Sequence, residues 1–258
     1  MKMFVTERRQ AIMELLHDKK RLTVKELATE IGVSEATLRA DLNKMEMDGL
    51  LTRTHGGAVL REETDNDTSF SVREKKNKEE KTKISERALE QITEKQCILL
   101  DASSTALELA RLIKNEPMRL TVVTSGVLTA LELKDNPNIT VIMIGGVVTN
   151  GSTSIEGTLG LDILNHVNID IMFTSGNGFS LESGLTDFNL YEVELKKQLV
   201  KKANKLVSIV DSSKIGVNSS SAFATIDEID ILITDKPIPI EFAEKLAQNN
   251  VHVITAAE

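Results

Sequence analysis

The 258-residue chain has few of the residues that mark disulfide or metal chemistry: one cysteine and four histidines. Its single cysteine, Cys97, excludes an internal disulfide, and its place in the apolar run CILLDA predicts a packed thiol rather than a nucleophile. The histidines lie far apart, and no histidine and cysteine cluster has the spacing of a metal site. We therefore expect no metal and no other cofactor.

Long apolar runs are also missing. No run approaches the roughly 18 residues that a membrane-spanning helix needs, and no apolar leader segment follows Met1. We therefore expect a cytoplasmic protein without a membrane partner.

An excess of positive charge is missing too, since the formal net charge is −8. Residues 1–60 nevertheless hold ten lysines and arginines against nine acidic residues, which leaves 21 against 30 in the remainder. An acidic body repels DNA, so any DNA binding would depend on a local basic surface within residues 1–60. The candidates for that surface are Arg8, Arg9, Lys25, Arg39, Lys44 and Arg53.

The best-defined local pattern lies within residues 23–57, after a first helix expected over residues 5–18. Leu27 and Ile31 share one helical face, and Gly32 can end that helix because it lacks a Cβ. Ser34 is placed to cap a second helix. Three apolar residues at i, i+4 and i+7 predict the buried stripe of this second helix: Leu38, Leu42 and Met45.

The opposite face of the second helix is polar or small, so its first residues could reach base edges in a major groove. Gly49 ends the helix, and residues 50–59 predict a strand, a turn and a return strand, which form a wing able to lie against sugar-phosphate. The predicted DNA-binding residues of helix and wing are Ser34, Glu35, Ala36, Thr37, Arg39, Asn43, Lys44, Arg53, His55 and Gly56.

This stretch resembles the amino-terminal winged helix-turn-helix domain of the DeoR family of bacterial transcriptional regulators. The residues that carry the resemblance are Val33-Ser34, Thr37, Leu38-Arg39-Ala40-Asp41-Leu42, Gly49-Leu50-Leu51, Arg53 and His55-Gly56-Gly57-Ala58. Ala40 departs from the family pattern, which often has a second arginine there. The base preference of the family therefore does not carry over at that position.

Three segments follow from this reading. Residues 1–60 form the DNA-binding domain, residues 61–83 are charged enough to predict a linker, and residues 84–258 form a sensor domain. Within the linker, Phe70, Arg73 and Glu80-Lys81 resemble the connecting segment of the family. The resemblance implies that this segment couples the two domains.

From Cys97 onward, short apolar strands alternate with amphipathic helices up to residue 255. This alternation predicts a larger Rossmann-like α/β domain, with a mostly parallel sheet covered on both faces. Ligands of such sheets bind beyond the carboxyl ends of the strands.

Polar turns follow several of these strands. Residues 101–105, Asp-Ala-Ser-Ser-Thr, open a helix whose N-terminal N–H groups could cradle a phosphate, although the same residues could simply cap that helix. Similar polar or glycine clusters stand at residues 124–126, 145–146, 176–178 and 211–214. Clusters that converge on one sheet edge favour a binding pocket.

These clusters resemble the DeoR-family sensor domain, which is similar in fold to ribose-5-phosphate isomerase and binds phosphorylated sugars or their relatives. Lys197 stands fourteen residues before Asp211 and so keeps an isomerase-like spacing, although it could equally be a solvated lysine on a helix. Lys214, at a strand end beside a glycine, is the better candidate for a phosphate partner. The residues that the resemblance assigns to effector binding are Asp101, Ser103, Ser104, Thr105, Thr124, Ser125, Gly145, Gly146, Asn177, Lys197 and Lys214.

The sequence thus predicts a repressor of a carbohydrate-utilisation operon that binds double-stranded operator DNA and is released by a phosphorylated sugar. Half-site recognition implies a homodimer or homotetramer. The alternative is a sugar-phosphate isomerase with an accessory helical domain; it requires a carboxylate base, and Asn177 stands where the isomerases have acidic residues. We therefore expect no catalytic residue and no enzyme. A protein-binding winged helix is a third reading, which Arg39, Arg53 and His55 disfavour.

Overall fold

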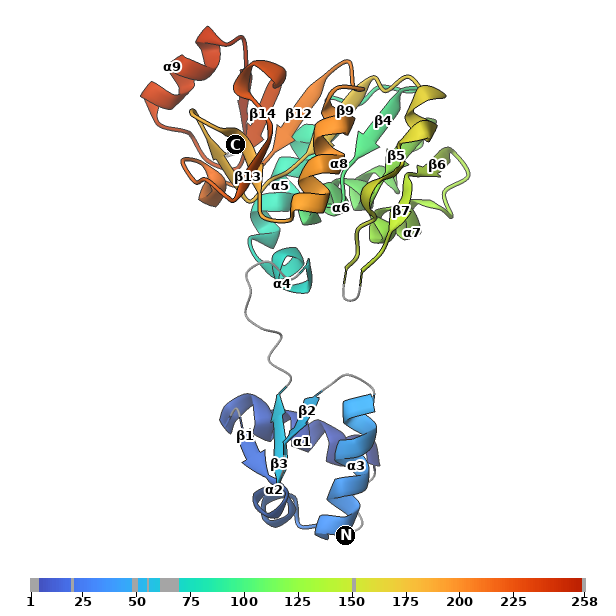
Figure 1. The fold of residues 1–258 in the computed structure, drawn as a ribbon, viewed down its shortest axis with the longest axis vertical. Helices are drawn as coiled ribbons and strands as arrows, with labels where there is room; N and C mark the ends of the chain where they lie inside the picture. Colours follow the sequence, from blue (N-terminus) through green and yellow to red (C-terminus); the bar gives the residue numbers. More distant parts are fainter. Residues whose placement is uncertain are drawn as a thin grey trace. The chain divides into compact units, whose positions relative to one another are not determined.

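The computed structural model describes residues 5–19, 21–47, 51–54, 56–60, 70–149 and 152–256. The chain forms two compact units, Met1–Ser69 and Phe70–Glu258 (Figure 1). His55, Gly49 and residues 61–69, to which the sequence assigned a wing contact, a helix end and linker, lie outside the described residues. Within the described part of the chain, no helix combines the length and apolarity needed to cross a bilayer.

The first unit is a three-helix domain with a small antiparallel sheet. Its strands follow the order β1-β3-β2, so β3 pairs with β1 as well as with β2. The sequence predicted the two wing strands and did not reveal β1. The elements are α1 (Val5–Lys19), β1 (Arg21–Thr23), α2 (Val24–Ile31), α3 (Glu35–Met47), β2 (Leu51–Thr54) and β3 (Gly57–Leu60).

Local hydrogen bonds set the ends of α2 and the start of α3. Thr23 caps α2, because its hydroxyl accepts a bond from the Glu26 N–H at 3.2 Å while the Glu26 carboxylate accepts one from the Thr23 N–H at 2.7 Å. Gly32 ends α2 with φ of 74°. Ser34 Oγ accepts a hydrogen bond from the Thr37 N–H at 3.2 Å. The predicted helix-turn-helix is confirmed.

The predicted stripe of α3 is also confirmed, since its three apolar residues are fully buried. They pack with residues of α1, α2 and the sheet in one core: Ile12, Leu16, Leu22, Val24, Leu27, Leu38, Leu42, Met45, Leu51 and Ala58. Ile31 only adjoins this core. The small domain therefore has its own apolar interior.

The second unit contains a seven-stranded parallel sheet of order β15-β14-β12-β9-β4-β5-β6. The elements in chain order are α4 (Phe70–Lys75), α5 (Lys78–Leu89), β4 (Cys97–Leu100), α6 (Ser104–Ile113), β5 (Leu120–Thr124), α7 (Val127–Leu133), β6 (Ile139–Met143), β7 (Gly145–Val147), β8 (Glu156–Gly160), η1 (Leu161–Asn165), β9 (Ile171–Thr174), β10 (Gly178–Ser180), β11 (Gly184–Asp187), α8 (Leu190–Val200), β12 (Leu206–Ile209), η2 (Ser212–Lys214), β13 (Ser221–Ala224), η3 (Ile226–Glu228), β14 (Ile231–Thr234), α9 (Ile240–Gln248) and β15 (His252–Thr255).

Both faces of this sheet are covered, as the apolar strands predicted. Leu99 of β4 belongs to one apolar cluster, whereas its neighbours Ile98 and Leu100 belong to the other. The same alternation occurs on β12, where Leu206 and Val207 lie in different clusters. The sheet thus separates two hydrophobic layers. Cys97, at the start of β4, is half-buried against one of them, and burial and the nearby Asp170 carboxylate raise the pKa of its thiol.

Two smaller antiparallel sheets, β10-β11-β13 and β7-β8, were not predicted. The predicted linker was too long, because the compact second unit already begins at Phe70 with α4 and α5. Asn77 and Lys81, which read as linker by composition, make hydrogen bonds inside this unit. Charged composition alone cannot distinguish such a segment from a solvated one.

Candidate functional site

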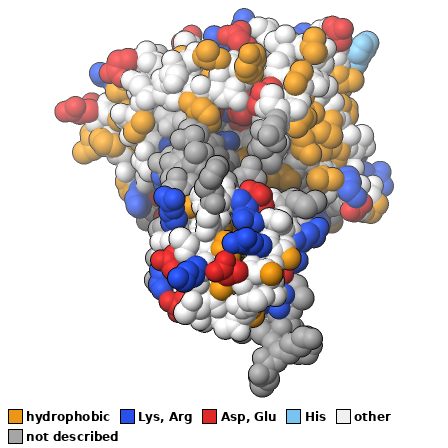
Figure 2. All heavy atoms as spheres, turned by 60° about the horizontal axis from the view of Figure 1, so that its bottom comes forward, with side chains coloured by type: hydrophobic (Ala, Val, Ile, Leu, Met, Phe, Trp, Pro, Cys, Tyr) orange, Lys and Arg blue, Asp and Glu red, His pale blue; other side chains and the backbone are white. Residues whose placement is uncertain are grey.

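The exposed face of α3 carries the predicted DNA-reading residues. Ser34, Glu35, Ala36, Thr37, Arg39, Asn43 and Lys44 are all exposed, while the opposite stripe is buried. Figure 2 shows lysine and arginine side chains interspersed with acidic ones over this unit. The helix can therefore present its polar face without loss of core contacts.

Arg39 and Arg53 are positioned by neighbours on α3. Arg39 Nη2 lies 3.0 Å from Glu35 Oε2, in a pair whose two side chains are largely exposed. Such pairs contribute little to stability, so Arg39 can exchange Glu35 for a DNA phosphate or base at small cost. Arg53 of the wing donates to Asn43, and its backbone N–H donates to Glu46 at 2.8 Å. These two hydrogen bonds fix the wing strand β2 against α3, so Arg53 lies beside the polar residues of the helix.

Two other basic candidates hold the domain together. Arg8 donates a hydrogen bond to the buried carboxylate of Asp41, and Arg9 lies 3.6 Å from the same group. The bond to Asp41 also raises the pKa of Arg8. Both arginines of α1 therefore bind a carboxylate of α3 and stabilise the packing of the two helices.

Gly57 is the first residue of the wing strand β3, and Gly56 directly precedes it. Gly56 is exposed, whereas a Cβ on Gly57 would come within 2.1 Å of the Leu22 carbonyl oxygen on β1. Gly57 is needed for the pairing of β3 with β1.

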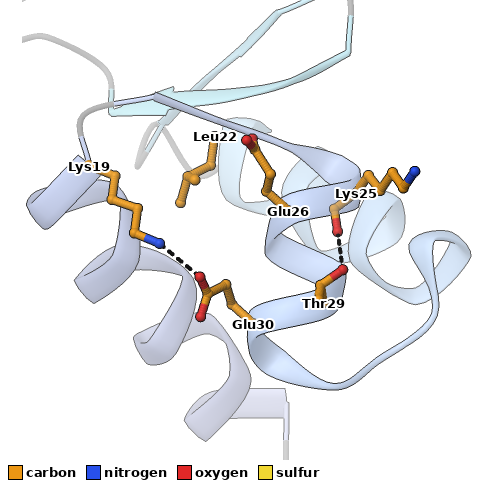
Figure 3. Close-up of a pocket in the computed structure, with 6 residues that line it drawn as sticks. All are labelled: Lys19, Leu22, Lys25, Glu26, Thr29 and Glu30. Carbon is orange, nitrogen blue, oxygen red and sulfur yellow. Dashed lines mark hydrogen bonds and ion pairs between the residues drawn. The ribbon is translucent and has the colours of Figure 1, made fainter.

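A shallow hollow of about 340 Å³ lies on the first unit at α1 and α2 (Figure 3). Lys19 Nζ and Glu30 Oε1 pair across it at 2.7 Å, and Thr29 donates to the carbonyl oxygen of Lys25 at 2.9 Å. Leu22 is its buried floor, and the remaining lining is exposed and polar. We assign it no ligand.

In the second unit, the predicted polar turns do converge. The neighbouring strands β12, β9, β4 and β5 are parallel, so the residues that follow them lie at one edge of the sheet. Asp101 follows β4, Thr124 ends β5 and Asp211 follows β12. The first two turns touch, because a Cβ on Gly126 would lie 3.3 Å from the Ala102 Cα.

Several hydroxyls at this edge already organise the turns. Ser103 caps α6 by accepting a bond from the Ala106 N–H at 3.1 Å, and Thr124 Oγ1 accepts one from the Gly126 N–H at 3.0 Å. Ser104, Thr105 and Ser125 are buried beside them. The capping function of Ser103 is confirmed, whereas its binding of an effector stays a prediction.

The centre of this edge is Lys196, which the sequence reading missed. Its Nζ lies 2.8 Å from the carbonyl oxygen of Ser175, 2.9 Å from Asp187 Oδ2 and 3.2 Å from Asp101 Oδ2. All four residues are buried. Spacing had selected Lys197, which instead pairs with Glu194 on the surface at 2.8 Å.

The buried lysine and carboxylates of this cluster stabilise one another's charged forms. Burial opposes ionisation of Asp101, but Lys196 and hydrogen bonds from Ser103 and Thr174 outweigh it and lower the Asp101 pKa. Burial likewise opposes the charge of Lys196, yet Asp187, Asp101 and Glu192 together raise its pKa. Lys196 therefore keeps its proton in the neutral range.

Glu192 lies beside this cluster on α8. Burial raises its pKa, against the opposing effect of Lys196. Its Oε1 accepts a hydrogen bond from Ser154 Oγ at 2.9 Å. This carboxyl is thus a candidate contact for a hydroxyl group of a ligand.

The segment from α4 to α5 adds basic groups at the same edge. Asn77 Nδ2 lies 2.9 Å from Asp211 Oδ1 and 3.3 Å from Ser213 Oγ. Arg73 stacks over the rings of Phe70 and Phe188, at 5.5 and 6.0 Å from their centroids. The segment thus contacts the turn after β12 and the start of α8.

Lys81 is the least expected of these groups. It is buried, and its ammonium donates to the backbone carbonyl oxygens of Arg73 and Lys76, where α4 ends. Among the residues that the structure describes, no carboxylate lies within ion-pair distance of it. Burial, with Lys214 and Arg73 nearby, lowers the Lys81 pKa to about 8, although Asp211 and Glu108 oppose this.

The other predicted effector residues are less central. Gly145 and Gly146 lie on the exposed strand β7, and Gly145 packs closely on Gly160 of β8. Asn177 is half-buried and its backbone N–H donates to Thr186 at 2.9 Å. Lys214 is half-buried at the end of η2. No group of three or more potential metal ligands occurs in the described residues.

Two family models match the chain, and each match lies within one of its units. Residues 8–64 match the DeoR-like helix-turn-helix domain, and residues 76–236 match the DeoR C terminal sensor domain. Ribose 5-phosphate isomerase A of Methanocaldococcus jannaschii aligns at 18% identity and a TM-score of 0.42, over 54% of this chain and 55% of that chain.

Relatives match over nearly the whole chain. HTH-type transcriptional regulator GolR of Listeria innocua is 47% identical over 92% of both chains, and GlpR of Haloferax volcanii is 34% identical over 98% of both. The glycerol-3-phosphate regulon repressor of Escherichia coli is 27% identical over 96% of this chain and 98% of that protein. The chain therefore belongs to the DeoR family of transcriptional regulators, with an N-terminal helix-turn-helix domain and a C-terminal sensor domain.

Proposed function

We propose that the chain represses a carbohydrate-utilisation operon by binding double-stranded operator DNA, and that a phosphorylated sugar releases it. The names of its relatives support this, since they include the glycerol-3-phosphate regulon repressor and a putative aga operon repressor. The observation that carries the proposal is the joint occurrence of an exposed reading helix and a second unit whose polar turns converge on one sheet edge.

Phosphate is the anion that this edge suits. The N-terminus of α6 offers backbone N–H groups beside Ser103 and Ser104, and a helix N-terminus favours negative charge. Lys81 and Lys214 add positive charge without a carboxylate at ion-pair distance among the described residues. The carboxyl of Glu192 and the amide of Asn177 would meet the hydroxyl groups of the sugar.

A binding protein without catalysis fits these groups better than an isomerase. Proton transfer at a sugar carbon needs an available base, and Lys196 holds its proton while Asp101 and Asp187 are bonded to it. Asn177 cannot act as a base at neutral pH. Incubation with pentose phosphates should therefore give no isomerisation, and measurable turnover would bring the enzyme reading forward.

The decisive experiment is fluorescence anisotropy of the protein on its own upstream DNA, at fixed salt, with a panel of sugar phosphates. We expect tight binding that one compound relieves. An allosteric coupling of about 1–3 kcal/mol, or roughly 5- to 150-fold in affinity, would be enough for a switch. If no compound alters DNA binding, the assignment of the first unit as the DNA-binding domain would stand, and sugar phosphates would be excluded as the effector class.

Arg39→Ala should weaken operator binding about tenfold, because one DNA contact of this kind is worth roughly 1–3 kcal/mol. The sugar phosphate should bind the variant as it binds the wild type, because Arg39 belongs to the first unit. Anisotropy and calorimetry measure the two affinities. Lys78→Ala, which removes one exposed charge from the second unit, is the matched control. If both variants bind the operator with equal affinity, Arg39 does not contact the DNA.

Ser104→Asp should raise the effector concentration needed for release by at least about tenfold, since a buried carboxylate there would repel a phosphate. DNA binding without effector should stay unchanged. Ser104→Ala separates charge from lost hydrogen bonding and should have the smaller effect. An unaltered response of the aspartate variant would refute the phosphate cradle at α6.

A further inference from the structure

One edge of the sensor unit is unusually apolar. Among the residues that the structure describes, most of the large apolar side chains that are exposed belong to α7, β6, β7, β8 and the start of α8. These elements adjoin, since α7 packs on β6, β7 pairs with β8 and α8 packs on β8. The side chains are Leu131, Met143, Val147, Val148, Leu159, Leu190 and Tyr191, and we call their surface the β6–β8 face.

The same edge is nearly free of charge. Residues 139–160 contain one charged side chain, Glu156, and it is buried. At the 27% charged content of the chain, about six would be expected in a segment of that length. Figure 2 shows hydrophobic side chains gathered on the side of this unit that carries β6 and β7.

The backbone at this edge is also open. Among the described strands, β6 is the last of the parallel sheet and pairs with β5 alone, and β7 and β8 form a sheet of two strands. Exposed edge strands usually carry lysine or other charges that prevent pairing with another chain. The absence of charge indicates that this edge is covered in the working protein.

The distribution of charge favours a second copy of the chain as the occupant of this face. Residues 70–258 hold 26 acidic against 20 basic side chains, so two copies of this unit repel one another over most of their surface. Across the β6–β8 face that repulsion is least, and a two-fold axis would set each apolar patch against its equal. A strongly basic partner would instead prefer the acidic remainder.

We propose that the β6–β8 face is the surface on which two copies of this chain pair. The inference rests on the proposed function in one respect, because recognition of two half-sites calls for a symmetric pair. It goes beyond that function by naming the surface. Contiguous exposed apolar patches of this kind mark protein interfaces.

Sedimentation velocity of the full chain without DNA tests the proposal. The wild type should sediment as a dimer or larger even multiple of its 28.4 kDa mass. Leu159→Lys, at a side chain that is 80% exposed, should weaken pairing at least about tenfold, because a lysine would be buried unpaired. Ile240→Lys on α9, at 77% exposure, is the matched control and should pair as the wild type does.

Other outcomes would overturn the proposal. A monomeric wild type would do so, as would a Leu159→Lys variant that pairs normally or an Ile240→Lys variant that is equally impaired. Far-ultraviolet circular dichroism confirms that each variant is folded. Calorimetry with sugar phosphates tests ligand binding by the sensor unit separately. If no sugar phosphate binds, the proposed function is contradicted, but the sedimentation result on pairing still stands.

Discussion

Replacing Lys196 with methionine should lower the free energy of unfolding of the sensor unit by about 3–5 kcal/mol, the usual effect of removing one partner of a buried ion pair. The methionine fills similar volume but leaves Asp101 and Asp187 without their cation. It also removes the hydrogen bond to Ser175 that links α8 to the end of β9. Urea unfolding followed by circular dichroism measures the loss.

Lys197→Met is the matched control, since it changes the adjacent residue of the same helix. Its ammonium pairs with Glu194 at the surface, and such pairs contribute about 0–1 kcal/mol. Adding Asp187→Asn to Lys196→Met should recover part of the stability, because one uncompensated charge is then removed. A loss below about 1 kcal/mol for Lys196→Met would mean that the cluster is not organised by charge.

The two proteins should also respond to pH in opposite directions. In the wild type the Asp101 pKa is lowered on folding, so its contribution is present above the unfolded pKa and is lost as pH falls through the folded value. In Lys196→Met, Asp101 lacks its cation, so burial should raise the Asp101 pKa above the unfolded value. The variant should then gain stability as pH falls from 7 to 5, so its free energy of unfolding should move closer to that of the wild type.

The contrast between Lys196 and Lys197 shows where sequence reasoning reaches its limit. Spacing from Asp211 selected Lys197, whereas the lysine that joins the buried carboxylates is Lys196, and one position turns a helical side chain by about 100°. Effector binding by Lys197 stays a prediction. The signal that could have found Lys196 is its place in the buried stripe with Val193 and Leu199. A lysine in such a stripe requires partners, and these come from strands distant in sequence.

The helix-turn-helix was predictable because its determinants are local. Gly32, Ser34 and the stripe from Leu38 act within a few residues of their own positions. The alternation of apolar strands also gave the parallel sheet. By contrast, β1 is three residues long and exists through pairing with β3, which no local pattern encodes.

The predicted linker failed for the same physical reason. Asn77 bonds to Asp211, which lies 134 residues away, and Lys81 is buried with its ammonium bonded to the carbonyl oxygens of Arg73 and Lys76. Composition registers the charges of this segment but not their partners. The effector edge is therefore partly built by residues that read as solvated, which makes α4 the first sensor element after the connecting residues.

Lys81→Met should weaken sugar-phosphate binding by roughly 10- to 100-fold, as expected for one hydrogen bond of about 1.5–3 kcal/mol to a charged group. The variant should still bind operator DNA, but more effector should be needed to release it. Calorimetry gives the first affinity and anisotropy the second. Lys83→Met, at an exposed position of the same helix, should change neither.

The pH dependence identifies Lys81 more specifically. With its pKa lowered to about 8, the ammonium is charged at pH 7 and largely neutral at pH 9. A sugar phosphate keeps its charge over this interval because its second pKa is near 6. Wild-type affinity should therefore fall as pH rises from 7 to 9, and the affinity of Lys81→Met should stay flat.

The coupling follows from the two carbonyl oxygens that Lys81 binds at the end of α4. An anion that draws the ammonium toward itself changes the hydrogen bonds of the helix that directly follows the connecting residues. A two-state element that both sites bias is the physical requirement for allostery. If Lys81→Met binds effector weakly but, at saturation, still releases DNA fully, then Lys81 contributes affinity alone and the signal passes through Arg73 and Asn77 instead.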